Sequence, residues 1–368
     1  MRTQLLQMTL VAGCLLLNTV SADEAAIKTL QSTTGTTGAG DARAAAQQIV
    51  AEGSDSLLPL LDGFADATPL GANWLRSVFE TVAAAELKSE RELPAETFIA
   101  FVRDTSNDPD ARRLAYEWLL KQDAELEAEL IPDLLQDPNA AFRRDAVQML
   151  IEQAEDAESE KATELYRQAM RGAVHDDQVK KIAAALKEAG EPVDLQQHFG
   201  FLPTWKIIGP FDNKEMKGFA VAYPPESEIA PDATYDGQLG EVSWQDISTD
   251  DDYGSVSIRD QIENYKGSLM YATASFTSTS DREVQLRLGT PNAWKLWVNG
   301  ELVFEREEYH RGTQMDQYIV PVSFRNGSNV IMLKVCQNEQ EESWAQDYKF
   351  QLRVSDASGA AILSAEKG

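Results

Sequence analysis

Few residues in this chain have the types and spacing that metal or nucleophilic chemistry needs. The sequence holds three histidines, His175, His198 and His310, and two cysteines. It contains no HExxH motif, no Cys/His cluster with zinc-ligand spacing and no Gly-x-Ser-x-Gly nucleophile elbow. Carboxylate pairs are uninformative, because 60 acidic residues place them throughout the chain. These patterns do not predict a catalytic centre or a histidine-based metal site.

Aromatic residues in turn-like segments are better candidates for a binding site. The face of an aromatic ring can stack on a sugar ring, while neighbouring polar groups bond the sugar hydroxyls. Ordinary packing in a protein core is the alternative for each such residue, and it stays open at this point. The candidate ligand-binding residues are Trp294, Tyr309, His310, Arg311 and Trp344.

An acidic run at residues 249–254 is a candidate cation site. It contains Asp250, Asp251 and Asp252 in succession. Carboxylates and backbone oxygens are the ligands that Ca²⁺ prefers, although the spacing does not match an EF-hand loop. We therefore keep these three aspartates as candidate ligands of a structural calcium ion. A solvated acidic loop is the alternative, and no other cofactor is expected.

The charge balance excludes some classes of partner. The chain has 33 basic and 60 acidic residues, a formal net charge of −27. Such a chain repels nucleic acid and anionic membrane surfaces. No segment after the N-terminus is long and apolar enough to span a membrane. We expect neither a nucleic-acid partner nor a transmembrane segment.

The N-terminus resembles an export signal. Arg2 precedes an apolar stretch, and Val20-Ser21-Ala22 is a small-x-small cleavage site, so residues 1–22 are predicted to be a signal peptide. Val11-Ala12-Gly13-Cys14 also resembles a lipobox, in which Cys14 would carry a lipid. We favour cleavage after Ala22, because the apolar run continues past Cys14. Both alternatives place the protein in the periplasm, in the cell envelope or outside the cell.

Residues 41–192 have a helical pattern. Asp108-Pro109 and Asp137-Pro138 each combine a helix N-cap with a proline suited to the first turn. The stretches Asp108–Leu119 and Leu130–Leu150 resemble HEAT or armadillo-like repeats. That resemblance implies an α-solenoid for residues 41–192, in which Arg112 and Arg143 bond within the array. Residues 23–40, rich in glycine and threonine, are predicted to be a flexible tether.

Residues 200–357 have a strand pattern, followed by a short tail at 358–368. Alternating residues flank Asn299-Gly300, a strong hairpin signal, and a second strand pair is expected around Asn326-Gly327. Cys336, in the second of these strands, is expected to be structural. Ala293–Gly312 and Tyr318–Gln337 resemble the galactose-binding-like domain that precedes the barrel in β-galactosidase-type enzymes. The resemblance implies an antiparallel β-sandwich of the jelly-roll type.

The two resemblances together point to recognition. The catalytic barrel of β-galactosidase-type enzymes needs about 250 residues, more than the helical segment offers. We therefore expect no enzyme, but an exported scaffold whose helices bind a protein and whose sandwich binds a glycan or a protein. A structural spacer of a cell-envelope complex is one alternative. An accessory or catalytic component of polysaccharide degradation is another.

Overall fold

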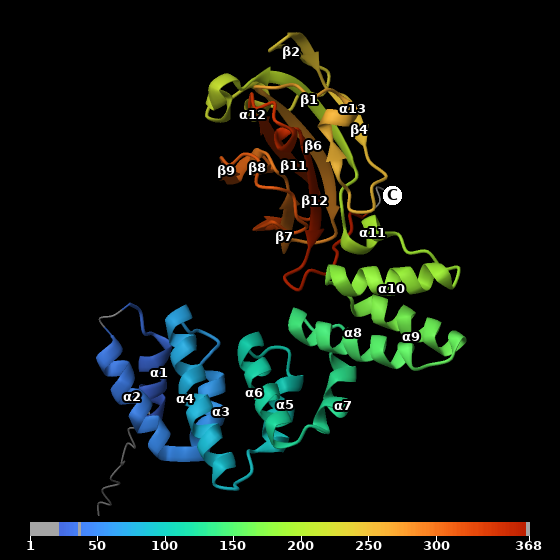
Figure 1. The fold of residues 1–368 in the computed structure, drawn as a ribbon. Helices are drawn as coiled ribbons and strands as arrows, with labels where there is room; N and C mark the ends of the chain where they lie inside the picture. The colour runs from blue at the N-terminus through green and yellow to red at the C-terminus, as the bar shows by residue number, and fades with distance from the viewer. Residues whose placement is uncertain (1–21, 36–37, 366–368) are drawn as a thin grey trace, which may run out of the picture. The chain divides into compact units, whose positions relative to one another are not determined.

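The computed structural model describes residues 22–35 and 38–365, as a mixed protein of α-helices and antiparallel β-sheets (Figure 1). The chain divides into two compact units, the first ending at Pro132 and the second beginning at Asp133. The expected domain boundary, between residues 192 and 200, lies inside the second unit. The helices between residues 140 and 199 therefore belong to the same compact unit as the sheets. The predicted signal peptide and Cys14 lie outside the described residues, apart from Ala22.

The described part of the first unit is helical. Its α-helices are α1 (Ala22–Gln31), α2 (Ala39–Glu52), α3 (Leu57–Asp62), α4 (Pro69–Lys88), α5 (Ala95–Arg103), α6 (Pro109–Gln122) and α7 (Leu126–Leu130). The expected start of α6 is confirmed, because the Asp108 side chain accepts hydrogen bonds from the backbone N–H groups of Asp110 and Ala111. Arg112 is buried, and its Nε donates to the Val102 carbonyl, 2.8 Å away in α5. Arg112 thus bonds within the helical unit, as expected.

The expectation of a flexible tether over residues 23–40 is wrong for its first part. Helix α1 occupies residues 22–31, and Ala26, Ile27 and Leu30 are buried. Their spacing of three and four residues gives α1 an apolar face that packs against α2 and α4. The glycines and threonines after this helix dominated the composition and concealed the pattern.

Four α-helices open the second unit: α8 (Ala140–Glu155), α9 (Ser159–Gly172), α10 (Asp176–Glu188) and α11 (Leu195–Phe199). Helix α8 is capped by Asn139 rather than by the expected Asp137. Asp137 instead accepts a hydrogen bond from the Asn139 N–H, 2.8 Å away, and so braces the cap. Arg143 donates to the Gly172 carbonyl at 3.1 Å, as expected, and also reaches Ser358 beyond the last strand.

Three antiparallel sheets follow. The largest has six strands in the order β4-β1-β6-β11-β8-β9, the second has four in the order β10-β7-β12-β5, and β2 and β3 form a hairpin. The strands are β1 (Thr204–Asp212), β2 (Thr234–Gly237), β3 (Gly240–Ser243), β4 (Gln245–Ser248), β5 (Val256–Ser257), β6 (Ser268–Ser278), β7 (Arg282–Gly289), β8 (Ala293–Val298), β9 (Glu301–Arg306), β10 (Tyr318–Phe324), β11 (Gly327–Gln337) and β12 (Lys349–Ser355).

The two Asn-Gly turns have different roles. Asn299 and Gly300 adopt φ values of 53° and 86° and join β8 to β9 in the expected hairpin. Asn326-Gly327 does not close a hairpin, because β10 pairs with β7 while β11 pairs with β6 and β8. This turn therefore carries the chain from the four-stranded sheet to the six-stranded sheet.

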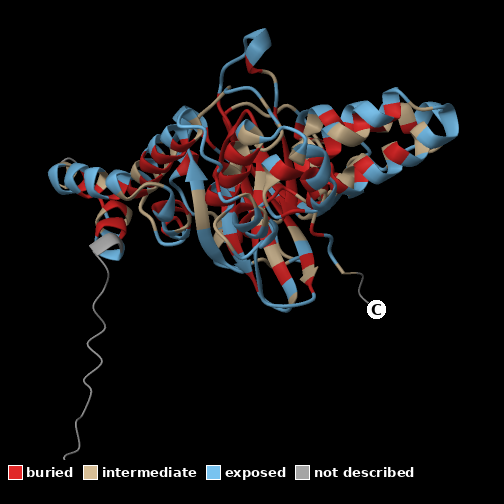
Figure 2. Ribbon diagram, turned by 90° about the horizontal axis from the view of Figure 1, so that it is seen from below, coloured by how far each residue is buried: buried red, intermediate tan, exposed pale blue. Residues whose placement is uncertain are grey.

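One core joins the two larger sheets. Trp205, Trp294 and Leu333 of the six-stranded sheet pack in the same buried cluster as Leu286 and Phe350 of the four-stranded sheet. Figure 2 shows such buried residues in red along the strands. The shared core therefore packs the two larger sheets against each other.

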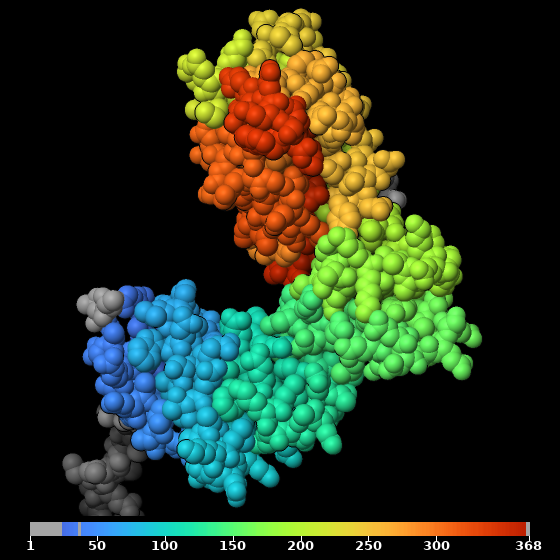
Figure 3. Space-filling view, in the orientation of Figure 1, coloured from blue at the N-terminus to red at the C-terminus, as the bar shows by residue number. Residues whose placement is uncertain are grey.

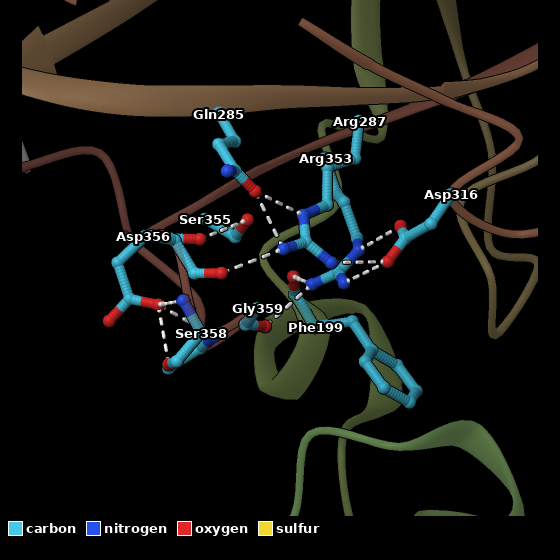
Figure 4. A network of polar contacts seen from close by, with 11 residues as sticks. Phe199, Gln285, Arg287, Asp316, Arg353, Ser355, Asp356, Ser358 and Gly359 are labelled. Carbon is cyan, nitrogen blue, oxygen red and sulfur yellow. Dashed lines mark hydrogen bonds and ion pairs between the residues drawn. The ribbon is translucent and has the colours of Figure 1, made fainter. Parts of the chain in front are cut away.

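An arginine–aspartate network braces the four-stranded sheet (Figure 4). Arg353 of β12 is fully buried, and its guanidinium donates to Asp316 at 2.6 Å and to the carbonyls of Phe199 and Gly359. Arg287 of β7 binds the same Asp316 carboxylate at 2.7 Å. Asp316 belongs to the loop between β9 and β10. The network therefore fixes that loop against the sheet and against α11.

Candidate functional site

A surface hollow of about 1120 Å³ lies between loops that leave the six-stranded sheet. We name it the aromatic hollow. It is lined by Met216, Tyr309, His310, residues 338–342 and Trp344. Figure 3 shows the surface of the second unit, with its late segments in orange and red. Two of these segments, the β9–β10 loop and the β11–β12 loop, supply most of the lining.

The β9–β10 loop fixes His310 in an unusual backbone conformation. His310 has a φ of 60°, a left-handed conformation that non-glycine residues adopt only where their surroundings hold them. Its N–H donates to the Pro291 carbonyl at 2.6 Å, and its Nε2 lies 2.9 Å from the Asn338 Oδ1. The His310 backbone is thus held by the β7–β8 turn and its imidazole by the β11–β12 loop, at the wall of the hollow.

The β11–β12 loop presents the indole of Trp344 to solvent. Trp344 lies in a short 3₁₀ turn, η4 (Ser343–Ala345), and is 60% exposed. The edge contact with His310 has a centroid distance of 5.1 Å and an interplanar angle of 86°. The turn is anchored from behind, because the Ala345 carbonyl accepts hydrogen bonds from Lys266 and Gln337. A large apolar ring is therefore held in place while most of it faces water.

A buried asparagine supports the floor of the hollow. Asn213 is fully buried, and its Nδ2 donates to the Tyr309 hydroxyl at 3.2 Å and to the Gln337 carbonyl at 3.1 Å. Burial raises the pKa of Tyr309, so its phenol stays neutral. A neutral phenol that accepts one hydrogen bond still has its own O–H to donate. Tyr309 can therefore serve as a polar contact at the base of the hollow.

Amides and carboxylates complete the lining. Asn338 and Gln340 are paired through their side chains at 2.9 Å, and the Asn338 Oδ1 also accepts the Gln340 N–H. Glu339 accepts a hydrogen bond from the Glu215 backbone N–H. Glu341 and Glu342 line the hollow beside Trp344. The hollow thus combines an exposed ring with several hydrogen-bonding side chains, the arrangement found in many small-ligand sites.

The structure brings three of the five predicted ligand-binding residues together and separates the other two. Tyr309, His310 and Trp344 line the aromatic hollow. Arg311 does not line it, although it is the next residue, and its side chain points to solvent in an ion pair with Glu308 at 3.2 Å. Met216, Asn338 and Gln340 also line the hollow and were not predicted from the sequence. The polar run at residues 338–342, between two apolar strands, was the available signal for the amides.

Trp294 is corrected from a candidate ligand contact to a core residue. It is 0% exposed and stacks on Phe304 with a centroid distance of 5.0 Å and an interplanar angle of 24°. Tyr318 covers it as well, at 5.1 Å. A ligand at the surface cannot reach this ring, because β8 begins at Ala293 and directs Trp294 into the shared core.

The proposed calcium ligands are also corrected. The Asp251 carboxylate accepts hydrogen bonds from the backbone N–H groups of Tyr253 and Ser255, and its carbonyl accepts one from Gln196. The aspartate therefore stabilises its own turn. Within residues 22–35 and 38–365, no group of three His, Cys, Asp or Glu side chains could hold a metal ion. Asp250, Asp251 and Asp252 do not converge on one point.

A second polar cluster, under the outer face of the six-stranded sheet, is structural. The Lys334 ammonium is fully buried and donates to the carbonyls of Phe219 and Val221 and to Glu226 at 2.9 Å. Burial lowers the pKa of Lys334. All three ammonium donors have partners, which leaves none for a ligand.

Nearby, burial raises the pKa of the Cys336 thiol to about 12, so this cysteine is unreactive, as expected for a structural one.

No family model and no curated protein matches this chain. Among solved structures, it is similar to the β-glucosidase of Kluyveromyces marxianus in complex with glucose, with 9% identity and a TM-score of 0.28, over 43% of this chain and 16% of that one. A selenomethionine-labelled form of that β-glucosidase is similar with 8% identity and a TM-score of 0.26, over 46% of this chain and 21% of that one. The GH31 α-xylosidase of Xanthomonas citri is similar with 15% identity and a TM-score of 0.16, over 25% of this chain and 12% of that one. The chain thus spans at most about a fifth of each structure.

These comparisons contradict the expectation that the chain is not an enzyme. The three structures named above are a β-glucosidase in two forms and a GH31 α-xylosidase, which are glycoside hydrolases. The non-catalytic assignment is therefore withdrawn. With TM-scores this low, the likeness assigns no activity to this chain, and glucose binding remains a property of the β-glucosidase.

Proposed function

We propose that this chain is an exported protein that binds a glycan through the aromatic hollow and a protein partner through its helices. One observation carries the glycan proposal. Trp344 is 60% exposed yet fixed against His310, in a hollow that also offers the amides of Asn338 and Gln340. The ring supplies an apolar platform for a sugar face, and the amides supply bonds to its hydroxyls.

The fold supports the same proposal. We propose that the two larger sheets form a galactose-binding-like jelly roll, with the aromatic hollow among the loops at one end. Their shared core and the Asn299-Gly300 hairpin support this assignment. We also propose that the helices are HEAT-like repeats. The buried arginines Arg112 and Arg143, each bonded to a carbonyl of a neighbouring segment, support that part.

Export rests on the pattern of residues 1–22. We propose cleavage after Ala22, with lipid attachment at Cys14 as the alternative. Within the described ranges, no helix has the length and apolar character that crossing a membrane requires.

Glycan binding is tested by screening the purified protein on a glycan array and then titrating positives by calorimetry. Trp344→Ala is expected to weaken binding about tenfold, because covering one indole face with a sugar contributes roughly 1–2 kcal/mol. Leu239→Ala is the matched control. Leu239 is 71% exposed in the β2–β3 turn, so its loss removes exposed apolar surface outside the hollow. Equal losses in both variants, or no bound glycan at all, would refute the proposal and favour a structural spacer.

A further inference from the structure

The aromatic hollow is lined by acidic side chains and by no lysine or arginine. Residues 338–345 contain Glu339, Glu341 and Glu342 and neither lysine nor arginine. The remaining lining residues, Met216, Tyr309 and His310, add no carboxylate and no permanent cation. A ligand in the hollow therefore meets carboxylates without a lining cation to balance them.

Several basic side chains near the hollow are bonded to other groups. Lys217 is paired with Glu215. Arg306 and Arg311 share the Glu308 carboxylate at 2.7 and 3.2 Å. Lys266 donates to the Ala345 carbonyl from behind the loop, and burial lowers its pKa. The charge of Lys266 interacts with those of Glu341 and Glu342, so one cation outside the lining faces two carboxylates that line the hollow.

The aromatic ring favours the same kind of ligand. The face of an indole attracts a cation through its quadrupole, and tryptophan does so best among aromatic side chains. Trp344 lies directly after Ser343 in the loop that carries Glu341 and Glu342, and all three line one hollow. An ammonium group seated there would meet carboxylates and a ring face together.

The floor provides an independent observation. Asn213 is fully buried, and its Oδ1 accepts no hydrogen bond from the described residues. Buried amide oxygens rarely lack a donor. Since the Nδ2 of the same residue holds the Tyr309 hydroxyl, this acceptor lies close to the base of the hollow. Asn213 does not itself line the hollow, so an ordered water beneath Tyr309 would satisfy this acceptor and link it to a ligand.

Resting on the proposed glycan binding, we infer that the aromatic hollow selects glycans with free amino groups over N-acetylated, neutral and uronic-acid glycans. A metal ion does not fit the carboxylates, because no three of them converge in the described ranges. An ammonium group fits better, since it needs one or two exposed carboxylates and a ring face. A uronic acid would meet like charge, and an N-acetyl group would remove the cation.

The inference is tested by titrating four oligosaccharides of equal length at about pH 6. The probes are a glucosamine oligomer, its N-acetylated form, a glucose oligomer and a galacturonate oligomer. The glucosamine oligomer is expected to bind about tenfold more tightly than its N-acetylated form at low salt. High salt should narrow that difference, because it screens exposed charges.

Charge variants separate this inference from the proposed function. E341Q/E342Q is expected to bind the glucosamine and glucose oligomers with similar affinity. E92Q/E96Q removes the same charge from exposed positions in the first unit and should keep the preference. Equal binding of the amine and neutral oligomers would overturn the inference and leave glycan binding standing. Absence of binding to all four would overturn the proposed function, as would binding of a lysine-rich peptide alone.

Discussion

Asp316 should be the residue on which the second unit depends most strongly outside its apolar core. It accepts hydrogen bonds from Arg353 at 2.6 Å and from Arg287 at 2.7 Å. Asp316→Ala would leave the Arg353 guanidinium, whose side chain is 1% exposed, with only the carbonyls of Phe199 and Gly359. Removing one partner of a buried ion pair costs about 3–5 kcal/mol. The two remaining carbonyls place the expected loss near 3 kcal/mol.

The assay is thermal unfolding of the second unit, followed by tryptophan fluorescence. A loss of this size lowers the midpoint by about 6–12 °C in a unit of this length. Asp246→Asn is the control, because Asp246 pairs with Lys206 at the surface and such pairs contribute below about 1 kcal/mol. Equal, small shifts in the two variants would refute the view that the network braces the sheet. Asp316→Ala should also weaken glycan binding, since Asp316 and His310 share one loop.

Acidification should weaken the same network. Burial alone would raise the pKa of Asp316, but the hydrogen bonds and charges of Arg353 and Arg287 outweigh burial and hold the pKa below its ordinary value. A carboxyl whose pKa is lowered by folding stabilises the fold above its unfolded pKa of about 3.9. That stabilisation is lost as pH falls through the folded value. Unfolding midpoints of wild type and Asp316→Ala should therefore converge at acidic pH, and a constant difference would contradict the assignment.

Three further outcomes follow from burial and hydrogen bonding. In a urea titration, Trp294→Ala should lower the free energy of unfolding by about 3–5 kcal/mol, whereas Trp344→Ala should leave it nearly unchanged. A larger loss in Trp344→Ala than in Trp294→Ala would contradict the placement of the two rings. In a protein that begins at Asp23, a thiol reagent should modify Cys336 only after denaturant is added; rapid modification of the native protein would disprove its burial. Calcium or a chelator should not move the melting temperature, because the Asp251 carboxylate is engaged by its own loop, and a clear calcium shift would restore that site.

The β-strands were the most predictable part of the fold. Alternation of apolar residues predicted the strands on both sides of Asn299-Gly300 and of Asn326-Gly327, but not the long strand β6. Asn299-Gly300 gave a correct hairpin because its two positive φ values suit such a turn. Asn326-Gly327 has the same dipeptide but connects the two sheets. Local sequence specifies a turn, whereas the partner of each strand is decided by which apolar face reaches the core.

A site residue was predicted correctly only where the sequence pattern indicated a loop and the side chain is in fact at least partly exposed in that loop. Pro291 and Asn292, which precede Trp294, favour a loop at this position. The alternation of Trp294, Leu296 and Val298 on one face of β8 marks it as a core residue. Trp344 has no such alternation around it, and it is exposed. Met216 and Asn213 come from a segment more than 90 residues before Tyr309, so only the fold brings them to the hollow.

The most direct test of the central claim uses the small number of histidines. His175, His198 and His310 are the three imidazoles of the chain, so a histidine-labelled sample gives a simple NMR spectrum. His310 contacts Trp344, while His175 directly precedes α10 and His198 lies in α11. Titration with the oligosaccharide that binds best in calorimetry should shift the His310 signal and leave the other two in place. A bound glycan that leaves His310 unchanged would show that the aromatic hollow is not the binding site.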